Sequence, residues 1–319
     1  YTNIDTLSLH DALPICQTIG SVTLTSTGAV NTANVGSYPI VPSAATGGTF
    51  APGNYTITYV NGALTVNRAA LTITAATNTK IYDGATSATA TPTVTGLQNT
   101  DTVTGLAEVY ADKTAGINKT LTVSAFTVND GNAGGNYTVT PVTNITGVIT
   151  ARSLTVTATG VNKPYDGATT ATVTLADNRV VGDLLTLTNT TATFADRNVG
   201  LAKPVSVSGV GVSGTDALNY TFNTTAATTA NITARPITVT AVTDTKIYDG
   251  TTSSIVVPTI SGGLGTGDTT TFAQTFNNRN AGTSKTLTPA GVVNDLNGGL
   301  NYLVTFTPVL TGTISQRAI

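Results

Sequence analysis

The five-residue stretch Lys80-Ile81-Tyr82-Asp83-Gly84 occurs again as Lys163-Pro164-Tyr165-Asp166-Gly167 and as Lys246-Ile247-Tyr248-Asp249-Gly250. The three tyrosines are 83 residues apart and then 83 residues apart again. A fixed period of this size predicts one small domain that is copied in tandem. We interpret the shared Lys, Tyr, Asp and Gly residues as a structural repeat motif, with Asp-Gly as a turn, because Gly accepts positive φ and Asp bonds to its own backbone.

Other phrases recur around this motif. An arginine and an alternating strand open each copy, at Arg68, Arg152 and Arg235, and Arg317 opens a further one. A second phrase carries an aromatic residue, a glycine and a lysine, and an Asn-Tyr pair precedes the closing strand. Period-two alternation indicates half-buried strands, and their even spacing with Gly/Asn turns favours an antiparallel sandwich. We therefore predict an all-β fold of tandem, small, Ig-like antiparallel β-sandwiches in an elongated array.

The periodicity divides the chain into segments. Residues 17–67 form a partial β repeat, in which Gly53 to Val66 reads as a hairpin around Asn61-Gly62. The predicted copies are repeat 1 (68–151), repeat 2 (152–234) and repeat 3 (235–316), and residues 317–319 start another.

Residues 1–16 are predicted not to be structured protein. Thr6 to Ile15 read T-L-S-L-H-D-A-L-P-I, which is the translation of a common sequencing-library adapter. The segment contains His10 and Cys16, the only histidine and the only cysteine. Without Asp5 and Asp11 the 16 acidic residues become 14, which balance the 14 Lys and Arg residues.

Composition excludes several classes of protein. Charged residues are 9% of the chain, against roughly 25% in ordinary soluble domains. A neutral chain offers no basic face for nucleic acid, and no apolar run is long enough to span a membrane. We therefore expect no nucleic-acid partner and no membrane insertion in this fragment.

These phrases resemble two repeat families. The three full copies resemble the YDG domain, through Tyr-Asp-Gly at 82–84, 165–167 and 248–250. The partial unit resembles the MBG domain, through the segments 29–40 and 54–59. The resemblance covers nearly all of the chain after residue 16. It implies an all-β repeat from a large bacterial surface protein, of the filamentous-haemagglutinin or autotransporter adhesin kind, and it implies no catalytic or ligand residues.

The sequence contains few residues of the types that catalyse reactions or bind metals. Without a histidine, and with Glu108 as the single glutamate, general acid–base catalysis lacks its usual groups, so we expect no enzyme and no cofactor. Zinc lacks thiol and imidazole ligands. Calcium is a weak alternative, because it binds clustered oxygen ligands. Its candidates are the recurring loop aspartates, which we otherwise interpret as turn and cap residues: Asp83, Asp166 and Asp249 first, then Asp101, Asp183, Asp268, Asp130, Asp216 and Asp295.

The recurring lysines and tyrosines have structural interpretations. Lys80 is expected to lie along Tyr82 with its amine near an acid, and Tyr82, Tyr165 and Tyr248 to cap the core with the hydroxyl at its rim. Lys119, Lys203 and Lys285 suggest Lys–Asn or Lys–Asp isopeptide bonds, but a glutamate catalyst occurs in repeat 1 alone.

We predict a non-enzymatic stalk segment of an exported bacterial surface adhesin, located extracellularly or at the cell surface. Its partners would be the neighbouring repeats of the same chain. The alternative is an adhesive module that binds a host surface glycan or protein through loops that vary between copies, such as Gly262 to Gly265. Aromatics are 6% of the chain and form no cluster in sequence, which favours the stalk.

Overall fold

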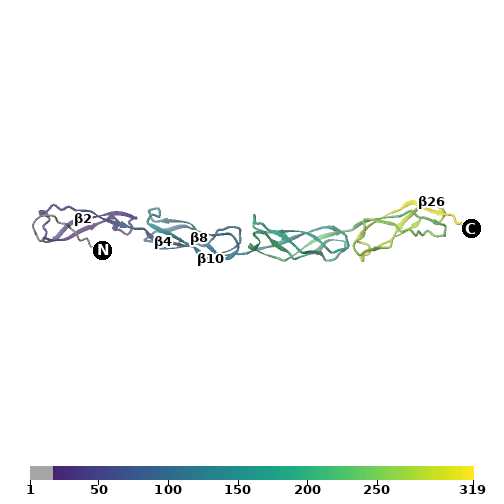
Figure 1. Cartoon of the computed structure of the whole chain (residues 1–319), viewed down its shortest axis with the longest axis horizontal. Helices are drawn as coiled ribbons and strands as arrows, with labels where there is room; N and C mark the ends of the chain where they lie inside the picture. The colour runs from purple at the N-terminus through teal and green to yellow at the C-terminus, as the bar shows by residue number, and fades with distance from the viewer. Residues whose placement is uncertain (1–16) are drawn as a thin grey trace. The chain divides into compact units, whose positions relative to one another are not determined.

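The fold is that of a computed structural model, which describes residues 17–319. The chain divides into two compact units. The first contains the described residues up to Ile81 together with Ala85–Thr150, and the second contains Tyr82–Gly84 together with Ala151–Ile319. Strands build both units, as the arrows in Figure 1 show, and the described helices are three short 3-10 turns. The predicted all-β repeat architecture is confirmed.

The first unit begins with one three-stranded antiparallel sheet, in the order β1-β2-β3. Its strands are β1 (Ile19–Thr25), β2 (Gly36–Gly48) and β3 (Gly62–Val66), and its 3-10 turns are η1 (Thr27–Ala29) and η2 (Pro52–Asn54). The predicted hairpin around Asn61-Gly62 is wrong, because β3 pairs with β2, with Ile40 opposite Gly62. The long strand β2 offers β3 an edge, while the Tyr59 hydroxyl accepts a hydrogen bond from the Ala45 N–H (2.9 Å).

Repeat 1 completes the first unit with two sheets, ordered β6-β4-β9 and β5-β10-β8-β7. The strands are β4 (Ala69–Thr74), β5 (Thr79–Ile81), β6 (Thr93–Thr95), β7 (Thr102–Tyr110), β8 (Gly116–Asn129), β9 (Tyr137–Val142) and β10 (Asn144–Thr150).

Repeats 2 and 3 lie in the second unit, and each contains a four-stranded sheet with the same strand order as that of repeat 1, while its other strands form sheets of two or three strands. Repeat 2 contains β11 (Arg152–Leu154), β12 (Val156–Val161), β13 (Lys163–Pro164), β14 (Thr172–Asp177), β15 (Thr186–Thr188), β16 (Thr191–Phe194), β17 (Gly200–Ser208), β18 (Gly211–Ser213), η3 (Ala217–Asn219), β19 (Tyr220–Phe222) and β20 (Thr225–Thr233). Repeat 3 contains β21 (Arg235–Thr240), β22 (Thr245–Ile247), β23 (Thr259–Ser261), β24 (Thr269–Thr270), β25 (Ala273–Phe276), β26 (Gly282–Ala290), β27 (Val293–Asn294), β28 (Tyr302–Thr307) and β29 (Val309–Ser315).

The three- and four-stranded sheets of repeats 1 to 3 are mixed, which corrects the expectation of purely antiparallel pairing. In repeat 3, β21 pairs with β28 in parallel, and β22 pairs with β29 in parallel. The same two parallel pairings join β4 to β9 and β5 to β10 in repeat 1. Parallel neighbours arise because the two opening strands lie beside the two closing strands, and the intervening segments supply the crossover that parallel strands need.

The core of each repeat consists of alternating strand residues, as the sequence pattern predicts. Leu71 and Ile73 on β4 are fully buried, and Ile237 and Val239 take their places on β21. The opposite sheet contributes an aromatic residue of the second phrase, which pairs with an aliphatic residue of the next strand: Tyr110 with Leu121, Phe194 with Val205 and Phe276 with Leu287.

Candidate functional site

The Lys-x-Tyr-Asp-Gly motif begins on a short strand, β5, β13 or β22, and continues into a tight turn. The glycines Gly84, Gly167 and Gly250 have φ angles of +80°, +83° and +82°, a region that other residues enter at a cost. The Asp166 carboxylate accepts a hydrogen bond from the Ala168 N–H (2.9 Å) and fixes the turn. Asp249 accepts the same bond from the Thr251 N–H (2.9 Å). The turn therefore aims the preceding tyrosine in a defined direction.

The motif lysine binds within its own repeat. The Nζ atoms of Lys80, Lys163 and Lys246 lie 5.5, 5.5 and 5.4 Å from the ring centroids of Tyr110, Phe194 and Phe276, respectively. This is a cation–π distance. Lys163 also donates to Asp166 (2.8 Å), and Lys246 to Asp249 (2.9 Å). The expectation that Lys80 lies along Tyr82 is thus corrected, because the lysine covers the aromatic residue of the core instead. The expectation that the lysine amine lies near an acid is confirmed in repeats 2 and 3.

The motif tyrosine leaves its own repeat, which corrects the expectation that it caps its own core. Tyr165 is 0% exposed, and its ring lies edge-on to Tyr302 of repeat 3 with 5.4 Å between centroids. Tyr82, which belongs to the second unit, packs in the same way on Tyr220 of repeat 2 at 5.5 Å. Tyr248 is 37% exposed. We call the Tyr-Asp-Gly turn the plug.

A second tyrosine and an aspartate receive the plug, and we call this pair the socket. The socket tyrosine opens the strand near the end of its repeat, and its hydroxyl donates to the aspartate at 2.6 Å in every copy: Tyr137 to Asp101, Tyr220 to Asp183 and Tyr302 to Asp268. The same hydroxyl accepts a backbone N–H, from Gln98 (2.8 Å), Val180 (2.8 Å) or Gly265 (2.7 Å). Because its two hydrogen-bonding roles are filled, the socket tyrosine has a fixed ring orientation.

The plug hydroxyl points at the socket carboxylate. Tyr82 donates to the Asp183 oxygens at 3.0 and 2.9 Å. Tyr165 Oη and Asp268 Oδ1 are both buried, and neither atom has a hydrogen-bond partner among residues 17–319. Burial, and next to it the nearby Asp268 carboxylate, raises the pKa of Tyr165 to about 12. Burial followed by the hydrogen bond to Asp268 raises the pKa of Tyr302 to about 12 as well, so these phenols stay neutral in ordinary buffers.

Charged and backbone groups around the plug complete the joint between repeats 2 and 3. The Arg197 guanidinium donates to the carbonyls of Thr266 (3.2 Å) and Asp295 (3.0 Å), and lies 3.3 Å from the Asp268 carboxylate. The Val199 N–H donates to Asn301 Oδ1 (2.9 Å). The joint therefore combines one buried ring with directional polar contacts.

A loop before the socket tyrosine holds this asparagine in place. The Asp295 carboxylate accepts the N–H groups of Asn297 (2.8 Å), Gly299 (2.8 Å) and Asn301 (3.1 Å). Burial alone would raise the pKa of Asp295, but these backbone donors outweigh it and lower the pKa. Asp130 accepts the corresponding three N–H groups in repeat 1. The backbone therefore occupies both carboxylates.

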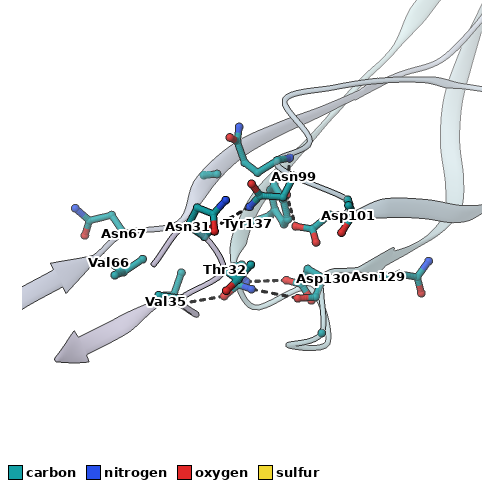
Figure 2. A pocket seen from close by; sticks show the side chains of 16 residues that line it. Asn31, Thr32, Val35, Val66, Asn67, Asn99, Asp101, Asn129, Asp130 and Tyr137 are labelled. Atoms are coloured by element: carbon teal, nitrogen blue, oxygen red, sulfur yellow. Dashed lines mark hydrogen bonds between the residues drawn. The ribbon is translucent and has the colours of Figure 1, made fainter. Parts of the chain in front are cut away.

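The first unit contains a related joint that no described residue fills with a plug. The Val35 N–H donates to Asn136 Oδ1 (2.9 Å), just as Val199 donates to Asn301. The Asn99 side chain donates to the Asn31 carbonyl (2.8 Å). Between these contacts lies a cavity of about 560 Å³, and Figure 2 shows Asp101 and Tyr137 among the side chains that line it.

The structure does not assemble a metal site from the predicted aspartates. No group of three or more His, Cys, Asp and Glu residues that could hold a metal occurs within residues 17–319. The recurring aspartates outside the Tyr-Asp-Gly motif instead accept hydrogen bonds. Asp183 accepts one from a tyrosine hydroxyl, and Asp295 accepts one from a backbone N–H group. His10 and Cys16 lie outside the described residues.

The lysines considered for isopeptide bonds are held by neighbouring loop residues. Lys119 pairs with Asp112, Lys203 with Asp196 (2.6 Å), and Lys285 with Asn278 (2.5 Å). The buried Glu108 carboxylate accepts a hydrogen bond from the Ala76 N–H (2.7 Å).

Among the described residues, no helix is long and apolar enough to cross a membrane.

The socket is the feature that the sequence analysis missed. Its aspartates were interpreted as turn and cap residues or as weak calcium ligands, and the tyrosine of the Asn-Tyr pair as the start of a strand. The sequence feature that could have indicated the socket is a recurring spacing, because the socket tyrosine follows its aspartate by 36, 37 and 34 residues in the three repeats.

Comparison with known families agrees with the repeat pattern. A family model described as the YDG domain matches residues 67–144, 150–229 and 233–309. A second model, described as the MBG domain (YGX type), matches residues 6–65. That match begins inside the predicted adapter-derived segment, which lies outside the described residues. A search of curated proteins found no match.

Proposed function

Because the chain belongs to the YDG-domain family, we propose that it is a non-enzymatic stalk segment of an exported bacterial surface adhesin, which spaces a distal binding domain from the cell. Tandem YDG and MBG repeats are typical of bacterial surface repeat proteins. In arrays of this kind the contacts are local and length grows with copy number. The expected location is extracellular or at the cell surface.

One observation carries this proposal: the most regular motif of the chain serves to join repeats. Tyr165 is completely buried against the next repeat, so its ring cannot also contact a host ligand. A joint with a buried ring, the hydrogen bonds of the Arg197 guanidinium and further backbone hydrogen bonds resists bending better than a flexible linker would. Such a joint suits a spacer.

The loop that suggested an adhesive module also contributes to the joint. Gly262 O accepts hydrogen bonds from the Arg235 guanidinium (3.0 and 2.7 Å), and the Gly265 N–H donates to the socket tyrosine Tyr302. Variation of this loop between copies therefore has a structural use. This favours the spacer over a module that binds host glycan or protein through the loop.

Solution scattering tests the proposal. Each of the four domains contains strands of roughly 7–14 residues, or about 25–45 Å at ~3.3 Å per residue, so an end-to-end array exceeds about 100 Å in maximum dimension. A compact particle would contradict the spacer. A glycan array and a host-cell binding assay on the same chain test the alternative, since saturable binding would establish an adhesive module.

A further inference from the structure

The cavity of the first unit is built around a socket of the same composition as those that hold plugs. It is lined by Asp101 and Tyr137 of repeat 1, together with Gln98, whose N–H orients the tyrosine hydroxyl. Asn31 and Val35 of the preceding domain lie on its other side (Figure 2). A volume of about 560 Å³ falls within the range of ~300–1,000 Å³ typical of ligand sites.

The second unit shows what such a socket holds. At the Tyr220–Asp183 pair the ligand is the ring of Tyr82, and at the Tyr302–Asp268 pair it is the ring of Tyr165. Both rings lie edge-on to the socket tyrosine, an arrangement that is favourable for aromatic pairs. The Asp183 carboxylate accepts both hydroxyls, at 2.6 Å from Tyr220 and 2.9 Å from Tyr82.

The carboxylate in the cavity has room for a second donor. Asp101 accepts one hydrogen bond, from Tyr137 to its Oδ2 atom, and no other described side chain donates to it. An ionised carboxylate accepts about four hydrogen bonds. A phenol that enters the cavity can therefore donate to Asp101 as Tyr82 donates to Asp183.

We propose that this cavity is a binding site for the side chain of a tyrosine in a Tyr-Asp-Gly turn. The phenol ring lies edge-on to Tyr137, and its hydroxyl donates to Asp101. The glycine is part of the recognition, because the plug backbone passes close to the socket: a Cβ at Gly167 would lie 2.5 Å from the Thr266 nitrogen. This inference deepens the proposed spacer role, on which it rests, by naming the chemistry that one repeat recognises in another.

A peptide titration on the full chain tests the site. The probe is a blocked peptide of residues 246–251, Lys-Ile-Tyr-Asp-Gly-Thr, added to the ¹⁵N-labelled protein and followed by NMR. We expect a dissociation constant on the order of 1 mM, since a single aromatic side chain supplies the contact. The amide shifts should change at Gln98, Asp101 and Tyr137. The same peptide with Tyr→Ala should leave these shifts unchanged.

Two protein variants localise the contact. Asp101→Ala should weaken peptide binding about tenfold, because it removes a hydrogen bond to a charged acceptor. Asp101→Asn keeps the shape and an acceptor, and should weaken binding by about threefold to fivefold. The matched control is Asp112→Ala, an exposed aspartate of the same repeat, which should not alter binding.

The proposal fails if the alanine peptide shifts the same amides, if the tyrosine peptide shifts only residues outside the cavity, or if no shift occurs at several millimolar peptide. None of these results bears on the maximum dimension of the chain in solution. Failure of the tyrosine site and failure of the spacer role are therefore distinguishable.

Discussion

The joint between repeats 2 and 3 should depend on the ring of Tyr165. The substitution Tyr165→Ala removes a side chain that is 0% exposed and lies against Tyr302 of the next repeat. Tyr248→Ala is the matched control, because Tyr248 occupies the same position of the same motif but is 37% exposed. The comparison cancels whatever the tyrosine contributes to its own repeat.

The magnitude follows from the difference in burial. An aromatic side chain buries about 200 Å², so an exposure difference of 37% corresponds to roughly 70 Å². At ~25 cal/mol per Å² this amounts to about 2 kcal/mol, and the edge-on ring contact adds about 1 kcal/mol. We expect Tyr165→Ala to lower the free energy of unfolding by about 2–3 kcal/mol more than Tyr248→Ala does.

Urea unfolding followed by circular dichroism measures both losses, and calorimetry shows whether repeats 2 and 3 still unfold together. In Tyr165→Ala the shared transition should split into separate ones, because the nearest-neighbour contact has been removed. In Tyr248→Ala it should stay single. Equal losses in the two variants, with no split, would refute the assignment of this tyrosine to the following repeat.

Four further predictions concern the same joint. Gly167→Ala should destabilise the chain by about 1–3 kcal/mol more than Gly250→Ala, since both glycines have the same φ but only the first would place a Cβ against the next repeat; urea midpoints check this. Arg197→Ala should cost about 1–3 kcal/mol, because it leaves the buried Asp268 carboxylate without its cation, whereas the exposed Arg279→Ala should cost less than ~0.5 kcal/mol; thermal melts distinguish them. The raised pKa of Tyr165, about 12 against ~10 in an unfolded chain, means that its contribution to stability is complete below pH ~10 and is lost as the pH rises through about 12; urea midpoints measured as a function of pH check this. A chain extended after residue 319 by a copy of residues 238–316 should bury Tyr248 and make Tyr248→Ala about as destabilising as Tyr165→Ala, which urea unfolding measures.

The strand pattern made much of the fold predictable. Alternation at Leu71/Ile73 and Ile237/Val239 identifies buried positions that depend only on the neighbouring residues of one strand. The hairpin around Asn61-Gly62 failed for the opposite reason. Strand β2 forms a ladder with residues 62–66, and this pairing prevails over the local turn preference of Asn-Gly.

The joint could not be derived from one copy of the motif. A tyrosine at the end of a short strand has the same local pattern whether its ring covers its own core or enters a neighbour. Tyr165 and Tyr248 share this pattern, although Tyr165 is buried and Tyr248 is 37% exposed. The choice depends on the socket, whose aspartate lies 101 residues after Tyr82, at Asp183, or 103 residues after Tyr165, at Asp268. Period and composition therefore identify the motif without identifying its partner.

The motif combines two functions: its lysine contacts its own repeat, and its tyrosine contacts the following repeat. Its lysine lies over the core aromatic residue of its own repeat, as Lys163 lies over Phe194, while its tyrosine two residues later enters the following repeat. The turn between them is held by Asp166 and needs the positive φ of Gly167. Because the lysine anchors the turn before the tyrosine reaches the socket, the plug is ordered in advance and less conformational entropy is lost when the joint forms. This explains why Lys, Tyr, Asp and Gly recur as a set, since each of these four shared residues fixes a different part of one joint.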